Sequence, residues 1–194
     1  MIARLVDVTL ENLRLAPPAC LESVFWELPP GAGGTAEDAR FHKEEWFSST
    51  LLEWGACGKL SMEGDRADGF AQYAPGPYFP RLDDYRCGRV SDDAVYLSYC
   101  YVEEPRRGTG LGSRLLRTVA REMVDRGYRA VEAIGDRDWS DGWVLPARFL
   151  GATGFRVLRE DPRFPLMRLD LRVTVGAGAA HERAAVPLPE PGSP

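Results

Sequence analysis

The stretch with the clearest chemical meaning is Arg107-Gly-Thr-Gly-Leu-Gly112, a glycine-rich loop that begins with an arginine. It follows an apolar, aromatic run, Ala94–Val102, and leads into an amphipathic segment, Ser113–Arg126. Glycines let backbone amides approach an anion closely, and the start of a helix adds unpaired N–H groups and the positive end of its dipole. The order of strand, glycine loop and helix therefore predicts that a phosphorylated ligand binds here.

Three phosphate-binding motifs compete for this loop. A P-loop requires a lysine directly after its last glycine, and none follows here. Gly108 and Gly110 match the first two glycines of the dinucleotide fingerprint GxGxxG, but Ser113 stands where its third glycine is required. The pattern Arg-x-x-Gly-x-Gly, in contrast, is matched in full by Arg107, Gly110 and Gly112.

Together with the strand before it and the long helix after it, the loop Val102–Gly112 resembles motif A of the GNAT family of acyl-CoA-dependent N-acyltransferases. Farther along, Ala147–Phe155 is similar to the family's motif B, a helix that ends in Gly-Phe before the next strand. The resemblance extends over Ala94–Leu171, and in the first 90 residues it rests only on the order of the elements. A tight turn that binds nothing is the alternative interpretation of the loop.

The resemblance implies an α/β (α+β) fold with a mixed, mostly antiparallel sheet flanked by helices. Two parallel central strands, Ala94–Val102 and Arg129–Ile134, would splay apart and admit the pantetheine arm of acetyl-CoA, with backbone pairing like that of an added strand. The loop amides would hold the pyrophosphate. The predicted cofactor-binding residues are Tyr101, Val102, Arg107, Gly108, Thr109, Gly110, Leu111, Gly112 and Ser113.

The resemblance also implies direct transfer of an acetyl group from acetyl-CoA to an amine within a ternary complex. Such a reaction needs a base for the amine, a donor that polarises the carbonyl, and an acid for the leaving thiolate. The motif B tyrosine that many members use as the acid corresponds to Leu150, which cannot donate a proton. We therefore predict Tyr99 and Glu103 as catalytic groups, although each also has a structural interpretation as a core-edge aromatic or a solvated charge.

The acceptor is expected near two stretches that are unusual for plain scaffold. One is the proline-rich loop Tyr73–Tyr85, and the other is Asp136–Trp143, in which three carboxylates alternate with two tryptophans. Such a wall suits a cationic, partly apolar amine, through charge and cation–π attraction, and the alternative is a loop packed by its own aromatics. The predicted acceptor-binding residues are Tyr78, Asp136, Asp138, Trp139 and Trp143. A further apolar group, Val24–Glu27, is interpreted as core rather than as a cover over the cleft.

The elements that must position these groups follow from periodicity and turn chemistry. A hydroxyl at Thr35 with a carboxylate at Asp38 predicts the start of a helix that extends to Trp54. Leu111, Leu115, Val119 and Met123 recur every four residues, which indicates one face of a helix that ends at Gly127. Shorter elements are expected as strands at Ile2–Val8, Cys57–Met62, Phe70–Tyr73, Phe155–Leu158 and Leu166–Val173, and as a helix at Leu145–Ala152.

The length, composition and charge of the chain limit its domain count and its possible partners. The 194 residues suit one domain over residues 1–175, followed by an Ala/Gly/Pro-rich stretch, 176–194, that we expect to be disordered. A net charge of −5 disfavours nucleic acid as a partner. We expect neither a signal peptide nor a membrane span, and four widely spaced cysteines without a CxxC pair predict a reduced, cytoplasmic protein with no metal site.

Three hypotheses about function remain open at this point. The first is an N-acetyltransferase, acting on a small amine, an antibiotic, a peptide N-terminus or a lysine. The second is a non-catalytic CoA-binding or regulatory protein on the same scaffold, which Leu150 keeps plausible. The third is a nucleotide-binding protein of another fold. A homodimer is compatible with all three.

Overall fold

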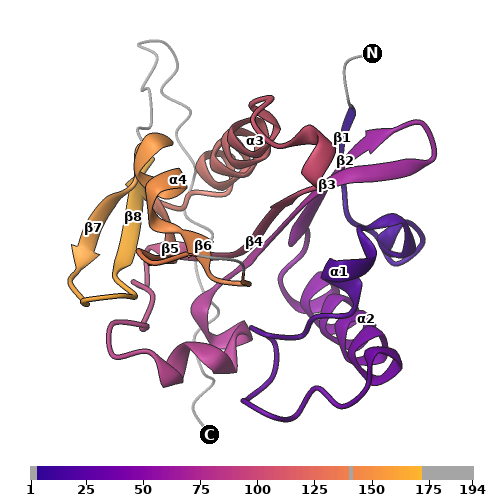
Figure 1. Ribbon diagram of the computed structural model, residues 1–194, viewed down its shortest axis with the longest axis horizontal. Helices are drawn as coiled ribbons and strands as arrows, with labels where there is room; N and C mark the ends of the chain where they lie inside the picture. Colours follow the sequence, from indigo (N-terminus) through magenta and orange to yellow (C-terminus); the bar gives the residue numbers. More distant parts are fainter. Residues whose placement is uncertain (1–3, 140–141, 172–194) are drawn as a thin grey trace, which may run out of the picture.

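The computed structural model describes residues 4–139 and 142–171, and within them the chain forms one mixed sheet flanked by helices (Figure 1). The strand order is β1-β2-β3-β4-β5-β8-β7, with β6 paired to β5 as the eighth strand. The pairs are antiparallel except for β4–β5 and β5–β6, so the expected mixed, mostly antiparallel architecture is confirmed. The strands are β1 (Arg4–Asp7), β2 (Gly58–Glu63), β3 (Arg66–Ala74), β4 (Ala94–Val102), β5 (Ala130–Asp136), β6 (Leu145–Pro146), β7 (Arg156–Arg159) and β8 (Leu166–Asp170).

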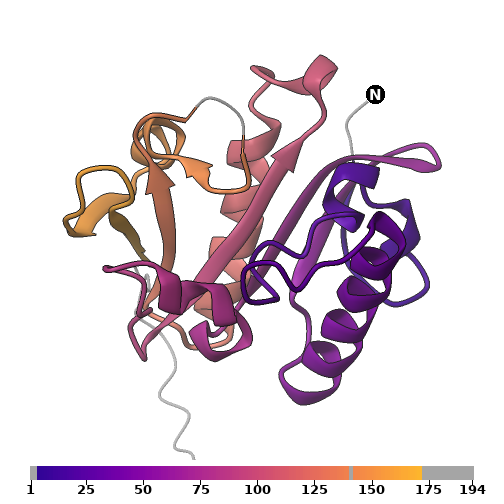
Figure 2. The same ribbon diagram turned by 60° about the horizontal axis from the view of Figure 1, so that its bottom comes forward.

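The α-helices cover the sheet on both faces, with α1 and α2 on one side and α3 and α4 on the other (Figures 1 and 2). The helices are α1 (Pro18–Leu21), α2 (Ala36–Glu53), α3 (Leu111–Asp125) and α4 (Ala147–Ala152). Short 3₁₀ turns occur at η1 (Leu13–Leu15), η2 (Gly76–Tyr78), η3 (Pro80–Asp84) and η4 (Glu104–Arg106).

Local sequence signals explain where the long helices begin and end. Thr35 caps α2: its Oγ1 accepts the Asp38 N–H at 3.2 Å, and the Asp38 carboxylate accepts the Thr35 N–H at 2.8 Å. Gly110 at φ +85° precedes α3, and Gly127 at φ +84° follows it. Only glycine adopts these left-handed conformations at little cost, which is why both ends were predictable.

Within the described residues, two elements start two or more residues away from the expected position. Strand β3 begins at Arg66 rather than Phe70, so Gly69 lies within the strand. Gly69 lies directly beneath α3, where a Cβ would come within 3.0 Å of Leu115 Cδ1. Gly69 is a poor strand former but is required by this close approach. The helix expected from Leu145 begins at Ala147, because Leu145 precedes a proline, which disfavours the helical region, and pairs with Gly135 as part of β6.

A β-bulge at Ser98 determines which side chains of β4 face which helices. The register passes from Gln72–Tyr99 to Tyr73–Leu97, which leaves Ser98 as the extra residue. As a result Tyr96 and Tyr99 belong to the same core cluster, on the α2 face. Beyond the bulge, Tyr99 and Tyr101 pack on the α2 face, whereas Cys100 and Val102 pack on the α3 face.

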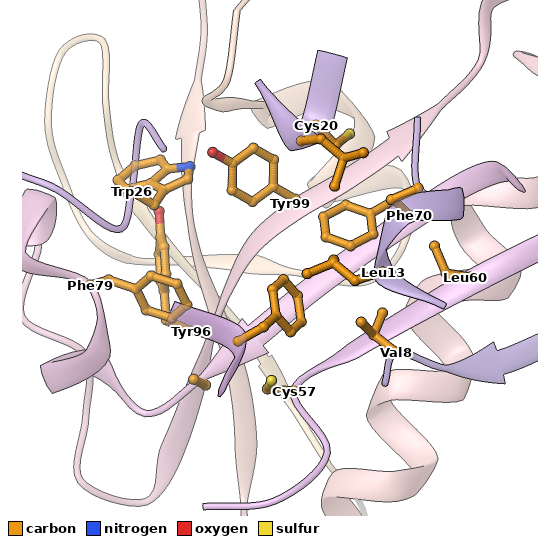
Figure 3. Close-up of a cluster of buried hydrophobic side chains, with 14 of the residues drawn as sticks. Val8, Leu13, Cys20, Trp26, Cys57, Leu60, Phe70, Phe79, Tyr96 and Tyr99 are labelled. Carbon is orange, nitrogen blue, oxygen red and sulfur yellow. The ribbon is translucent and has the colours of Figure 1, made fainter. Parts of the chain in front are cut away.

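The α2-face core is built mainly from large rings. Figure 3 shows Trp26, Tyr96 and Tyr99 within this cluster, with Phe79 beside Tyr96. Trp26 is 1% exposed, with its ring centroid 5.1 Å from that of Tyr96. The interpretation of Val24–Glu27 as core is confirmed at Trp26.

The parallel strands β4 and β5 pair only at their beginnings. Ala94–Tyr96 lies against Ala130–Glu132, and farther along β5 pairs with β6 instead. Figure 2 shows the two strands diverging beyond that point. The closed end is held by Arg168 of β8, whose guanidinium donates to Asp93 at 2.9 Å and to the fully buried Glu132 at 2.8 Å. The expected splay between the two strands is thus confirmed.

Several expectations fall partly or wholly outside the described residues. These include the proposed tail, 176–194, and the last two residues of the strand expected at Leu166–Val173. None of the helices in the described part of the chain is long and apolar enough to span a membrane.

Candidate active site

A cavity of about 760 Å³ lies where β4 diverges from β5, and it is lined by β4, by the glycine loop and by the segment that carries β6 and α4. Residues from both faces of the sheet line it, because Tyr99 and Tyr101 belong to the α2-face core while Cys100 and Val102 belong to the α3-face core. The cavity therefore passes through the plane of the sheet. It joins the glycine loop on one side to a group of aromatic rings on the other.

The glycine loop forms the α3 side of this cavity. The lining residues from the loop and the helix start are Arg107, Gly108, Gly110, Leu111, Gly112 and Ser113. A Cβ on Gly108 or Gly110 would meet nothing within 4 Å, so the space in front of the loop is open. Since the first N–H groups of an α-helix have no partner within it, the start of α3 can donate to an anion in this space.

Three arginines surround the loop, and they differ in how they are held. Arg106 Nε lies 3.1 Å from the buried carboxylate of Asp68 on β3, which keeps that guanidinium at the sheet edge. Arg107 is exposed, and its Nε donates to the Val102 carbonyl at 3.1 Å. Arg148 is exposed on α4. Arg107 and Arg148 are therefore the side chains best placed to add charge to an anion bound at the loop.

The backbone of β4 offers hydrogen bonds to the cavity at every second residue. The Glu103 N–H donates to the Asp68 carbonyl at 2.9 Å, so Glu103 and, two residues earlier, Tyr101 point their backbone groups toward β3. Val102 and Cys100 consequently point theirs toward the cavity. The backbone pairing with the pantetheine arm that was predicted for Tyr101 is therefore corrected, because its ring rather than its backbone faces the cavity. The same prediction still fits Val102, whose backbone groups do face the cavity.

Thr109 has a different place from its neighbours in the loop. Its Oγ1 donates to the Arg106 carbonyl at 2.7 Å, and it is not among the residues that line the cavity. This bond braces the turn that carries the two left-handed glycines.

The aromatic side of the cavity is formed by Tyr99, Tyr101, Trp139 and Trp143. The Trp143 ring centroid lies 5.4 Å from that of Tyr99 and 6.4 Å from that of Tyr101. Trp26 Nε1 donates to the Trp143 carbonyl at 3.1 Å and so ties the segment after β5 to the N-terminal segment. The predicted Trp139 and Trp143 thus lie at the cavity.

The hydroxyl of Tyr99 is already engaged within the protein. It lies 3.1 Å from Ser23 Oγ and 3.3 Å from Glu27 Oε2. Burial, with the negative charge of Glu27 second, raises the pKa of Tyr99 well above its usual value, so the phenol keeps its proton. Tyr99 therefore serves as a fixed wall of the cavity, and its catalytic role stays a prediction.

Glu103 stands at the end of β4, outside the residues that line the cavity. Its Oε2 accepts from the Tyr101 hydroxyl at 3.4 Å. Burial, followed by the charge of Glu103, raises the pKa of Tyr101. Glu103 is thus connected to the cavity through one phenol.

The structure does not bring Tyr78 and Asp136 to the cavity. Tyr78 lies against α2, where its hydroxyl donates to Glu53 at 3.3 Å and its carbonyl accepts from Trp46 Nε1. Asp136 is buried against Arg163, with N–O distances of 3.3 Å to both carboxylate oxygens. Its charge is compensated there, and its bond to Arg163 raises the pKa of that arginine.

The charged acceptor wall is therefore corrected for Asp136 and Asp138, whereas the third carboxylate, Asp141, lies outside the described residues. Asp138 is exposed and its N–H donates to Asp136 Oδ1 at 2.9 Å, so these two residues form a local turn rather than a binding wall. Neither lines the cavity. Within residues 4–139 and 142–171, no group of three or more His, Cys, Asp or Glu could hold a metal ion.

A buried polar network behind Tyr99 was missed by the sequence analysis. Lys43 of α2 forms an ion pair with Glu27, and both side chains are 1% exposed. Gln72 Nε2 donates to the same carboxylate at 2.7 Å, and Lys43 Nζ lies 4.2 Å from the Tyr99 ring centroid. The available signal was the helical spacing of Ala39, Lys43 and Phe47, which places a lysine on the buried face of α2.

Comparison with known proteins assigns this architecture to a family. Residues 21–141 match the model of the acetyltransferase (GNAT) family, so the chain belongs to that family, whose members are acyltransferases. A comparison with curated protein sequences found no match.

Solved structures share the fold at low sequence identity. The PaiA N-acetyltransferase of Thermoplasma acidophilum, in complex with coenzyme A, has a TM-score of 0.58 at 12% identity and covers 88% of this chain and 99% of its own. For an N-acetyltransferase from Staphylococcus aureus the TM-score is 0.56 at 18% identity, with 88% and 99% covered. For the GNAT family N-acetyltransferase YhbS of Escherichia coli, in complex with CoA, it is 0.53 at 15% identity, with 89% and 83% covered.

Proposed function

We propose that this protein transfers an acetyl group from acetyl-CoA to an amine, directly, within a ternary complex. The observation that carries the proposal is the cavity that crosses the sheet between β4 and β5. An anion-binding loop opens on one face and an aromatic pocket on the other. Such a passage lets two ligands approach from opposite faces and meet beside the β4 backbone, which lowers the entropic cost of bringing them together.

The α3 side of the cavity fits the donor. The unpaired N–H groups at the start of α3, with Arg107 and Arg148 nearby, suit a pyrophosphate. The cavity-facing backbone groups of Cys100 and Val102 suit the amides of a pantetheine arm. Arg107 must then release the Val102 carbonyl, which it can do because it is exposed.

The chemistry requires proton transfer and a polarised carbonyl. Acetyl-CoA supplies an activated acyl group, and the cavity-facing N–H of Val102 or Cys100 would polarise its carbonyl. Glu103, acting through the Tyr101 hydroxyl, is the proposed route for proton movement at the end of β4. Tyr99 is retained as a second candidate, with its hydroxyl bound to Ser23 and Glu27.

The proposal is tested in two steps. At a hundred times its Kd, acetyl-CoA is expected to raise Tm by about 5–10 °C, because it binds the folded state alone. Thiol release from acetyl-CoA is then followed with a panel of amines. A Tm increase without release for any amine would contradict transfer and leave only binding.

A non-catalytic CoA-binding protein is the second candidate, and Leu150 favours it. This residue occupies the position where many members have the acid, and it is fully buried in the α3-face core. It can neither donate a proton nor approach a ligand. The thiol-release measurement distinguishes the two functions.

Direct transfer makes a prediction about Cys100, which lines the cavity and whose thiol donates to the Gly112 carbonyl at 3.6 Å. Burial raises the pKa of this thiol to about 12, so only about one ten-thousandth of it is ionised at pH 8. Cys100→Ala is expected to change kcat by less than about twofold, since a thiol so rarely ionised is a poor nucleophile. Mass spectrometry of the wild-type protein after incubation with acetyl-CoA is the check. An acetylated Cys100, together with a large loss of activity in the variant, would indicate a covalent intermediate instead.

A further inference from the structure

We infer that the acceptor is an amine carried on an aromatic or broad apolar group, bound as a ring against Tyr101 and Trp143 rather than by countercharges. The inference rests on the proposed acetyl transfer and names its substrate class. It replaces the cationic acceptor that the sequence suggested. Four observations carry it: the arrangement of the rings, their rigidity, the connection to the reacting end of the cavity, and the charge around them.

The rings are arranged as two sides of a pocket. Tyr99 and Tyr101 come from β4, and Trp143 comes from the segment that follows β5, so the pocket bridges the two diverging strands. The Trp143 ring is inclined by 62° to Tyr99 and by 36° to Tyr101. The half-buried rings of Tyr101 and Trp143 thus offer apolar surface to the cavity, and the buried Tyr99 ring packs behind them.

The pocket is rigid because bonds behind the rings hold it. The Tyr99 ring is 2% exposed and has Lys43 Nζ 4.2 Å from its centroid, while its hydroxyl is held by Ser23. The Trp143 carbonyl is held by Trp26, itself buried in the core. A preformed apolar pocket binds an apolar group without a further ordering cost, which favours affinity for a ring of matching shape.

The pocket also lies where an amine would be needed. Cys100 and Val102 alternate with the two tyrosines along the same strand, and their backbone groups face the cavity. A ring seated against Tyr101 would thus place a short aminoalkyl substituent beside the backbone groups that suit the thioester.

The charges around the cavity also favour an apolar acceptor over a polycationic one. Among the described lining residues, the charged ones are Arg106, Arg107 and Arg148, and the guanidinium of Arg107 lies 5.9 Å from the Tyr101 ring centroid. The nearest buried carboxylates are compensated, Glu27 by Lys43 and Asp136 by Arg163. A polycationic acceptor would therefore find no carboxylate among the described residues that line the cavity, whereas an apolar ring needs none.

The experiment is thiol release from saturating acetyl-CoA with amines that differ in the group they carry. 2-Phenylethylamine and tryptamine are compared with ethylamine, spermidine and kanamycin. We expect kcat/KM for the two aromatic amines to exceed that for ethylamine by at least about tenfold, as burial of one ring predicts. Spermidine and kanamycin are expected to be no better than ethylamine.

Variants locate the preference in the pocket. Trp143→Leu is expected to reduce kcat/KM for tryptamine at least about fivefold relative to ethylamine, with KM for acetyl-CoA unchanged. The matched control is Trp46→Leu, which removes an equally half-buried indole beside Phe79, away from the cavity, and should keep the wild-type ratio. Should Trp143→Leu fail to fold, Tyr101→Leu provides the same comparison.

The outcomes separate this inference from the function on which it rests. Faster release with spermidine or kanamycin than with the aromatic amines would overturn the aromatic acceptor and leave acetyl transfer standing. Release with none of the amines, despite a Tm increase with acetyl-CoA, would overturn both. An unchanged ratio of tryptamine to ethylamine in both pocket variants would also overturn the assignment to these rings.

Discussion

Gly110→Glu is expected to weaken CoA binding by at least about a hundredfold, whereas Gly127→Glu is expected to leave it unchanged. Gly110 precedes α3 and lines the cavity, and a side chain there would project into open space in front of the loop. Its carboxylate would occupy the space proposed for the pyrophosphate. Like charges placed together in a binding site cost several kcal/mol.

Gly127 is a close match as the control, because it has the same conformation at the other end of the same helix. Its φ is +84° against +85° for Gly110, and a Cβ at either position meets nothing within 4 Å. Each substitution forces a side chain into the left-handed region at a cost of about 1–2 kcal/mol. Gly127 does not line the cavity, so its variant reports the loss of stability alone.

Isothermal titration with CoA and thermal unfolding together measure the two effects. Similar losses in Tm for both variants, with loss of binding for Gly110→Glu alone, would support the loop as the phosphate site. Tight CoA binding by Gly110→Glu would show that the phosphates lie elsewhere.

Lys43→Met is expected to destabilise the fold by about 3–5 kcal/mol, because it leaves the buried Glu27 carboxylate without its countercharge. Both side chains of the pair are 1% exposed, so water cannot replace the lost partner. Burial lowers the pKa of Lys43, and the nearby Glu27 opposes that shift. The lysine is thus kept in the core mainly by this one carboxylate.

The double variant Lys43→Met with Glu27→Gln tests that reason. Because both charges are then gone, it is expected to be more stable than Lys43→Met alone, although two side chains have changed. Urea unfolding followed by tryptophan fluorescence gives each free energy of unfolding. Losses that simply add would show that Glu27 and Lys43 do not act as a pair.

An exposed ion pair on the same helix is the control. Arg40 lies one turn before Lys43 and contacts Glu22 at 2.7 Å, with 49% and 40% of the two side chains exposed. Exposed pairs contribute at most about 1 kcal/mol, so Arg40→Ala should change stability little. A loss as large as that of Lys43→Met would point to a general effect of shortening side chains on α2.

The sequence analysis was most accurate where a signal is local. The bounds of β4 were predicted to the residue, because its apolar and aromatic side chains form one continuous run. The capping box at Thr35 and the left-handed Gly127 were also predictable. In each case the residues that determine the conformation are neighbours in the chain, so no distant partner is needed to interpret them.

The errors in the site have the opposite origin. Asp136 was expected to bind an acceptor, but its partner, Arg163, is 27 residues away and reaches it only because β5 and β8 are paired. The position of Tyr78 is also determined by distant residues, because Trp46 and Glu53 of α2 hold it away from the cavity. The residues next to a carboxylate or a phenol in a loop do not indicate which distant side chain will bind it.

The sequence by itself determined the glycine loop, the helix that follows it and the family, because glycine conformation and helical period are properties of short segments. Only the tertiary structure decided what the other side of the cavity is. The bulge at Ser98 turns three tyrosines of β4 to one face of the sheet. Pairing with β3 directs the backbone of Val102, rather than that of Tyr101, into the cavity. Arg163 compensates the charge of Asp136. These depend on strand register and on contacts between distant residues, and in the described part of the cavity wall they place aromatic rings where Asp136 and Asp138 were expected.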